Sequence, residues 1–172
     1  MTIDIANIKY YLSGGASNAD PLLSIGGAKS SVAVSATALG NLFDPVTGDE
    51  AAAGVTRYRL VYLQNDDADA SGLLDPAVLW WSTSPSAGQT IAVGLADAGK
   101  NAEETAISTE HTAPADVSFA SPVTKGTGVS LPDGPYEEDD YIGVWLRVVT
   151  SVGATKRTTS GAPVLRLQAD GA

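Results

Sequence analysis

The chain has no cysteine and only one histidine among its 172 residues. Without cysteine there is no disulfide framework and no thiolate ligand for a metal ion. A Ser-His-Asp triad depends on the mutual geometry of a hydroxyl, a base and an acid. The single histidine, His111, lies in the polar stretch 108–116, and no G-x-S-x-G motif precedes a helix. We therefore predict that His111 is a solvated loop residue and that the protein is not an enzyme.

Basic residues are also scarce, since 10 Lys and Arg stand against 20 Asp and Glu and the formal net charge is -10. Nucleic-acid binding needs a basic face that releases counterions, so we predict no nucleic-acid partner. No apolar run approaches the roughly 18 residues of a membrane span. Residues 1–12 carry Asp4 and no basic region ahead of an apolar stretch, so we expect neither a membrane span nor a signal peptide.

Carboxylates are plentiful, but they gather in loops, and no pair stands apart as the two acids of a glycosidase would. The loop 67–72 matches the opening of an EF-hand loop, D-x-D-x-S-G, whose alternate oxygens converge on a cation. The match then ends, because position 12 of the motif is Val78 and no helices flank the loop. We predict no cofactor and no firm metal site. The weak candidates for cation ligands are Asp67, Asp69 and Ser71.

What the chain does contain is a pattern of short strands. Residues 56–65 alternate with period 2 and place Tyr58, Leu60 and Tyr62 on one face. A polar loop, 66–72, follows, and the chain returns as residues 77–83. Two strong strands so close in sequence predict an antiparallel pair. Further strands are predicted at residues 7–12, 29–36, 90–95, 117–119, 129–131, 141–150 and 163–169.

Helix is expected only as single turns, at residues 49–53 and at 102–107 within the polar excursion 97–113. The fold class is therefore all-β. Eight to nine short strands predict an antiparallel β-sandwich, with jelly-roll and immunoglobulin-like topologies both open. The length fits a single domain over residues 1–172, in which the glycine- and turn-rich region 1–54 is a candidate for an extended arm.

Five side chains on the predicted strands are candidates for an interface. Adjacent residues on a strand point to opposite faces, so one of Trp80 and Trp81 leaves the main core. That tryptophan packs under a loop or a second sheet, lies in a subunit interface, or forms a platform for a sugar. Trp145 is the third candidate. Arg57 and Arg59 share a face, where they make rim contacts or pair with the acidic loops.

Six segments are informative when they are taken together and in order: residues 8–21, 41–54, 58–65, 78–95, 112–122 and 141–150. Together they resemble a family of small virion structural proteins of tailed bacteriophages. The likeness departs at the acidic run 137–140.

The resemblance implies a non-enzymatic protein that is made in the host cytoplasm and resides in the virion in many copies. It implies a capsid decoration or cement protein whose partners are the major capsid protein or other virion proteins. It also implies a homo-oligomer, for which a trimer at the capsid symmetry axes is one form. Two alternatives stay open: a tail, neck or baseplate accessory protein, and a carbohydrate-binding β-sandwich that uses an exposed tryptophan.

Overall fold

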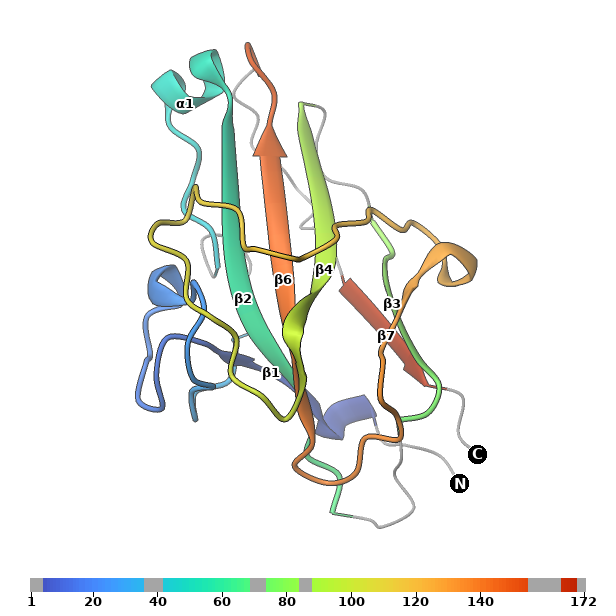
Figure 1. Cartoon of the computed structure of the whole chain (residues 1–172). Helices are drawn as coiled ribbons and strands as arrows, with labels where there is room; N and C mark the ends of the chain where they lie inside the picture. The colour runs from blue at the N-terminus through green and yellow to red at the C-terminus, as the bar shows by residue number, and fades with distance from the viewer. Residues whose placement is uncertain (1–4, 36–41, 69–73, 84–87, 155–164, 170–172) are drawn as a thin grey trace.

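The computed structural model describes residues 5–35, 42–68, 74–83, 88–154 and 165–169 (Figure 1). The described residues are mostly antiparallel β-strand with little helix, in agreement with the all-β prediction. They form seven strands, fewer than the eight or nine predicted. In chain order the elements are η1 (Ile5–Asn7), β1 (Ile8–Leu12), η2 (Pro21–Leu23), α1 (Gly48–Ala53), β2 (Val55–Asn65), β3 (Ala77–Trp81), β4 (Gln89–Lys100), η3 (Lys125–Thr127), β5 (Val129–Ser130), β6 (Tyr141–Thr150) and β7 (Leu165–Ala169).

The strands form two sheets with the orders β1-β2-β6-β4 and β5-β3-β7. The predicted pairing of β2 with β3 is wrong, because β2 pairs with β1 and β6 while β3 pairs with β5 and β7. The β2–β6 ladder runs from Val55 opposite Thr150 to Gln64 opposite Tyr141. This long match occupies one edge of β2 and β1 takes part of the other, so β3 is left to the second sheet.

One face of the four-stranded sheet, called the inner face, packs against the second sheet. Alternate residues of β2 and β6, among them Val61, Leu63 and Val144, meet Leu79 and Trp81 of β3 in one buried cluster. The region predicted as a candidate arm contributes here as well, because β1 is an edge strand of the four-stranded sheet.

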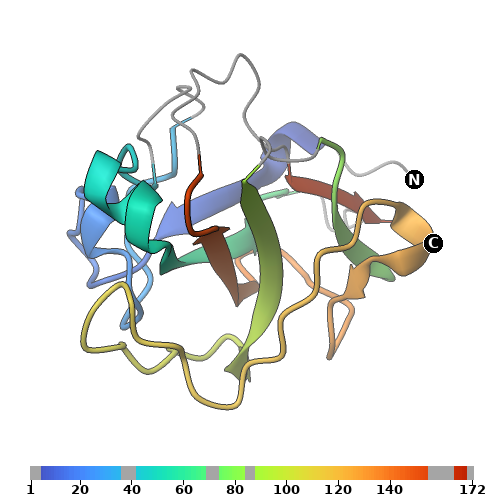
Figure 2. The ribbon, with the colours of Figure 1, turned by 90° about the horizontal axis from the view of Figure 1, so that it is seen from above.

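The opposite, outer face is buried by irregular chain. Residues 101–122, called the covering segment, leave β4, cross to the edge of β2 and return to β4 (Figures 1 and 2). The Ile107 amide donates to the Ile25 carbonyl at 2.9 Å, and Val93 and Ala120 exchange two backbone hydrogen bonds. Val117 and Phe119 pack on the buried outer cluster beneath them.

The helical turn predicted at 102–107 and the strand predicted at 117–119 are both absent from the covering segment. The segment's backbone forms hydrogen bonds with the sheet edges, with residues 25–27 and with the Tyr62 hydroxyl, so it needs no regular structure of its own. The strand predicted at 29–36 is also wrong over its described residues 29–35. They run beside β1 with backbone hydrogen bonds but form an isolated bridge, Tyr11 to Ala33, and no regular strand, because the hydroxyls of Ser30 and Ser31 tie this stretch to the neighbouring loop.

The helical turn predicted at 49–53 is confirmed as α1. Thr47 and Glu50 form a capping box, in which each side chain accepts a hydrogen bond from the other residue's backbone amide. No residue of α1 is buried. The cap, the contacts of Glu50 and a hydrogen bond from the Gly153 amide to the Ala51 carbonyl hold the helix in place.

Candidate functional site

Arg57 and Arg59 lie inside the protein, with side chains only 6% and 2% exposed. Strand alternation places both on the inner face, near the start of β2, where residues 42–50 cover them. Arg57 Nη1 donates to the carbonyl of Asp44 and Arg59 Nε to that of Leu42, both at 2.8 Å. The Arg59 guanidinium also lies 5.4 Å from the centre of the Phe43 ring.

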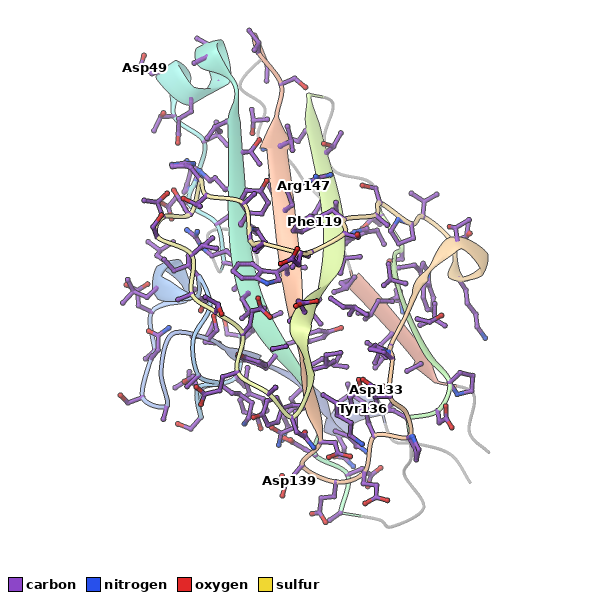
Figure 3. All side chains as sticks on the ribbon, viewed as in Figure 1. Asp49, Phe119, Asp133, Tyr136, Asp139 and Arg147 are labelled. Atoms are coloured by element: carbon purple, nitrogen blue, oxygen red, sulfur yellow. The ribbon has the colours of Figure 1, made fainter. Side chains whose placement is uncertain are left out.

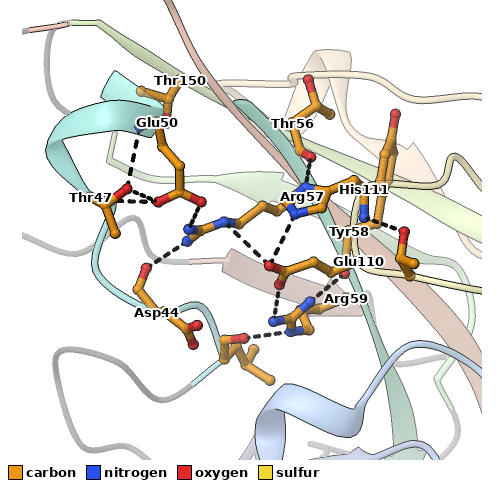
Figure 4. A network of polar contacts seen from close by, with 12 residues as sticks. Asp44, Thr47, Glu50, Thr56, Arg57, Tyr58, Arg59, Glu110, His111 and Thr150 are labelled. Carbon is orange, nitrogen blue, oxygen red and sulfur yellow. Dashed lines mark hydrogen bonds and ion pairs between the residues drawn. The ribbon is translucent and has the colours of Figure 1, made fainter. Parts of the chain in front are cut away.

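Two carboxylates complete this network, which Figure 4 shows from close by. Glu50 of α1 pairs with Arg57, and Glu110 of the covering segment pairs with Arg59. Glu110 Oε1 also lies 3.6 Å from Arg57 Nε. The two arginines therefore pair with acids, but the predicted pairing with the acidic loops is wrong. The partners are Glu50 and Glu110 and do not come from the acidic loops 66–69 and 137–140.

The Glu50 carboxylate is held in its ionised form. The Thr47 backbone amide donates to Glu50 Oε2 at 2.8 Å, as does the Thr47 hydroxyl, and Arg57 binds Oε1. The hydrogen bond from the Thr47 amide, followed by the one from Arg57, lowers the pKa of Glu50 to about 2. The same carboxylate thus caps α1 and fastens it to β2.

His111 borders a hollow of about 350 Å³ next to this network. The hollow is lined by Asp49, Glu50, Ala53, Gly54, Val55 and His111. His111 is half exposed, its Nδ1 donates to the Thr56 carbonyl oxygen at 3.0 Å, and its Nε2 lies 3.5 Å from Glu110 Oε1. None of the residues that line this hollow carries a hydroxyl. What the arrangement does is hold the covering segment to the edge of β2.

The tryptophans occupy three different environments. Trp81 is 4% exposed in the inner core, and Trp145 is fully buried beneath the covering segment with Tyr58 and Tyr62. Trp80 faces away from the inner core and is half-buried. The expectation that Trp80 and Trp81 point to opposite sides is therefore confirmed. Trp80 is the one member of the five interface candidates with substantial accessible surface.

Acidic residues concentrate at the end of the molecule where β2 and β4 finish and β6 begins, called the acidic end (lower part of Figure 3). Lys9 pairs with Asp66 and Lys100 with Asp140, at 2.8 and 2.7 Å. Burial works against ionisation of both carboxyls, but hydrogen bonds from Lys9 and Tyr11 to Asp66 outweigh it and lower its pKa. The pKa of Asp140 falls in the same way through Asn101 and Lys100. The acidic end consists of Asp66, Asp67, Asp75, Asp97, Glu103, Asp133, Glu137, Glu138, Asp139 and Asp140.

The cation ligands predicted in the loop 67–72 are only partly visible. Asp67 is 7% exposed and its backbone amide donates to Asn65 Oδ1 at 3.0 Å. Asp69 and Ser71 lie outside the described residues. Within the part of the chain that the structure describes, no group of three or more His, Asp or Glu side chains is arranged to hold a metal ion. The cation role of Asp67, Asp69 and Ser71 stays a prediction.

Sequence reasoning missed Glu50 and Glu110 as partners of the buried arginines. A local signal existed for Glu50, because Thr47-Gly48-Asp49-Glu50 has the spacing of a capping box. Glu110 carries no such signal. It is 51 residues from Arg59 in sequence, and only the path of the covering segment brings the two together.

Comparisons with protein-family models, curated proteins and solved structures found no match to this chain. Among the described residues, no helix is long and apolar enough to cross a membrane.

Proposed function

We propose that this chain is a non-enzymatic virion structural protein of a tailed bacteriophage, and that it acts as a capsid decoration or cement protein. Two kinds of support combine: the resemblance of six segments to such proteins, and the way the chain uses its polar side chains. The proposal includes the finer fold assignment, in which the two sheets form an antiparallel β-sandwich of jelly-roll or immunoglobulin-like type. The single buried cluster that both sheets share supports that assignment.

The observation that carries the proposal is that the two buried arginines and their acidic partners are used inside the protein, where they join separate elements. Arg57 and Arg59 tie α1 and the covering segment to β2 through Glu50 and Glu110. A buried ion pair is weak evidence for stability, and the role proposed for these pairs is to hold the elements they join in one arrangement. The result is a rigid scaffold whose outside surfaces are the parts left for recognition.

The edges of the four-stranded sheet support the same conclusion. Before Val61, where β1 no longer pairs with it, β2 itself forms the edge, and there Leu60 donates its amide to the Ser24 carbonyl and Tyr58 to the Glu110 carbonyl, at 2.8 and 2.7 Å. On the other edge, Val93 of β4 bonds Ala120. Closed edges prevent uncontrolled strand pairing between copies, which is the main hazard for a β protein at high local concentration. A protein that covers a particle in many copies needs this protection.

In this proposal the partners are the major capsid protein or other virion proteins, and the protein itself is a homo-oligomer, a trimer being the form that suits the symmetry axes of a capsid. Its location is the virion. No observation favours the alternative of a tail, neck or baseplate protein. The carbohydrate-binding alternative now depends, among the tryptophans, on Trp80, because Trp81 and Trp145 are buried.

The experiment that tests the proposal is cryo-electron microscopy of the native particle, combined with mass spectrometry of its proteins. We expect this chain in purified virions, as density that follows the capsid lattice and has the shape of two packed sheets. Density confined to the tail would favour the alternative of a tail, neck or baseplate accessory protein. Absence of the chain from purified particles would overturn the proposal.

A further inference from the structure

The covering segment leaves one part of the outer face open to solvent among the described residues. The segment crosses β4 at Val93, where Ala120 bonds it, and the strands continue beyond that crossing toward α1 (Figure 1). Two rows of side chains follow on this face. They are Tyr58, Arg147 and Ala92, and then Thr56, Val149 and Thr90. Thr90 is exposed, and Thr56, Arg147 and Val149 are partly exposed.

Arg147 lies in the middle of this open face, and no acid among the described residues pairs with it. Its guanidinium lies 4.8 Å from the centre of the Phe119 ring, and its Nε is buried with no hydrogen-bond acceptor (Figure 3). The described residues provide no ion pair or hydrogen bond for its remaining nitrogens, and none for the hydroxyls of Thr56 and Thr90. Three side chains with hydrogen-bond donors that have no partner among the described residues thus lie at neighbouring positions of one sheet face.

By contrast, four other basic side chains form ion pairs with acids. Lys9, Arg57, Arg59 and Lys100 each pair with an acid within their own chain. Arg147 and Arg166 are the arginines that meet no carboxylate among the described residues, and of these two it is Arg147 whose Nε is buried without an acceptor. Arginine binds carboxylates in a bidentate, planar geometry, so the chemistry that fits this face is a carboxylate brought by a partner.

The chain itself carries the complementary surface at its other end. Asp133, Glu137 and Glu138 of the acidic end are exposed and have no cationic partner among the described residues. β6 begins beside this end at Tyr141 and reaches Arg147 six residues later, about 20 Å along an extended strand. Within one molecule the two surfaces therefore do not meet. Between two molecules, a contact that joins acidic end to acidic end would be repulsive.

We propose that the outer face around Arg147, with Thr56 and Thr90, docks the acidic end of a second copy of this chain. The contact is head-to-tail, so it closes into a ring or continues as a filament according to its rotation. It rests on the proposed function only for the expectation that copies are gathered at high local concentration. The carboxylates of Glu137 and Glu138 are the first candidates for the partner of Arg147.

The test is sedimentation velocity on the purified full chain over a range of concentrations, at about 50 mM and about 500 mM NaCl, because salt screens contacts between exposed charges. We expect the wild-type protein to self-associate and to do so more weakly at the higher salt. Arg147→Glu should weaken association at least tenfold. Arg166→Glu is the matched control, since Arg166 is an exposed arginine on β7 with no acid partner in the described residues, and the change in net charge is identical. It should associate as the wild type does.

Two further variants keep the test decisive. Thr90→Glu adds a negative charge to the same face at an exposed position, so it should weaken association even if Arg147→Glu fails to fold. The double variant Glu137→Lys/Glu138→Lys should weaken association alone and recover it when mixed with Arg147→Glu. Circular dichroism and thermal unfolding confirm that each variant is folded.

Three results would overturn the docking proposal. They are a wild-type protein that stays monomeric at about 50 mM NaCl up to about 1 mM protein, an Arg147→Glu variant that associates normally, and an Arg166→Glu variant that loses as much. Each of these would leave the location of the protein in the particle, tested by microscopy, unaffected.

Discussion

The inner face of the four-stranded sheet and the part of its outer face beneath the covering segment are both buried, but by different means. The inner face meets a second sheet and is filled largely by aliphatic side chains such as Val61, Leu63 and Val144. The outer face meets the irregular covering segment and is filled by aromatic side chains, with Trp145 at the centre. In a sheet, the backbone amides and carbonyls are already hydrogen-bonded to neighbouring strands. A loop in the same place must find hydrogen-bond partners for every backbone amide and carbonyl that it buries.

The outer face provides those partners. The Tyr62 hydroxyl donates to the Gly27 carbonyl at 2.7 Å and accepts from the Glu104 amide at 2.9 Å. Burial raises the pKa of Tyr62 to about 12. Tyrosine is suited to this position because its ring fills the core while its hydroxyl serves a loop backbone. A loop therefore replaces a sheet layer when the side chains beneath it carry polar ends.

The largest effect is expected from removing the centre of the outer face. Trp145→Ala deletes a fully buried ring, and we expect it to lower the free energy of unfolding by about 4 kcal/mol. Leu63→Ala, at a fully buried inner position, should cost about 3 kcal/mol. Urea unfolding followed by circular dichroism measures both. If Trp145→Ala costs clearly less than Leu63→Ala, the covering segment collapses into the space and is a looser layer than the second sheet.

The next largest loss of stability is expected from Glu110, which anchors the covering segment to β2. Glu110→Gln removes the charge that pairs with Arg59 and lies near Arg57. Arg57 keeps Glu50, but the buried Arg59 guanidinium loses its acid. We expect a loss of about 3 kcal/mol in the free energy of unfolding, typical of breaking a buried pair from one side. Glu138→Gln, at an exposed position, is the control and should change stability by less than about 0.5 kcal/mol. Equal effects of the two variants would mean that Glu110 fastens nothing.

A smaller loss of stability is expected from a substitution that disturbs the covering segment and leaves the inner face unchanged. Gly94 of β4 has no Cβ, and a Cβ there would lie 2.6 Å from Val117 Cγ1 and 2.8 Å from the Ser118 carbonyl oxygen. Gly94→Ala should therefore cost about 2 kcal/mol through overpacking. Hydrogen exchange should rise at residues 117–120 and stay unchanged in β3. Gly126→Ala, where a Cβ meets nothing within 4 Å, is the control.

The smallest effect concerns pH and the attachment of α1. The pKa of Glu50 is about 2 in the folded protein, below its ordinary value of 4.5, so the unfolded chain binds protons more readily. The stabilisation from Glu50 is therefore complete above about pH 4.5 and is lost as the pH falls toward 2. Urea midpoints measured between pH 2 and pH 6 should fall less steeply for Glu50→Gln than for the wild type. Identical slopes would contradict the role given to this carboxylate.

The contrast between the two faces also shows how far the sequence could be interpreted. Alternation over residues 56–65 and 141–150 correctly located β2 and β6, and it correctly separated Tyr58, Leu60 and Tyr62 from the other face of β2. Those patterns arise from the two-residue repeat of an extended chain, which is a local property. The turn at α1 was equally local, because an acid-rich stretch next to Thr47 supports its own cap.

The partners of those strands, and the material that buries them, were decided only in the tertiary structure. A period of 2 says which residues share a face, but it does not say that β2 joins β6, or that β3 belongs to another sheet. The polar composition of the covering segment predicted exposure, and it gave no sign that this segment would lie over Trp145. Arg57 and Arg59 are buried because acids distant in sequence arrive beside them. Whether a charge lies inside or outside depends on such long-range contacts, which local residue patterns do not encode.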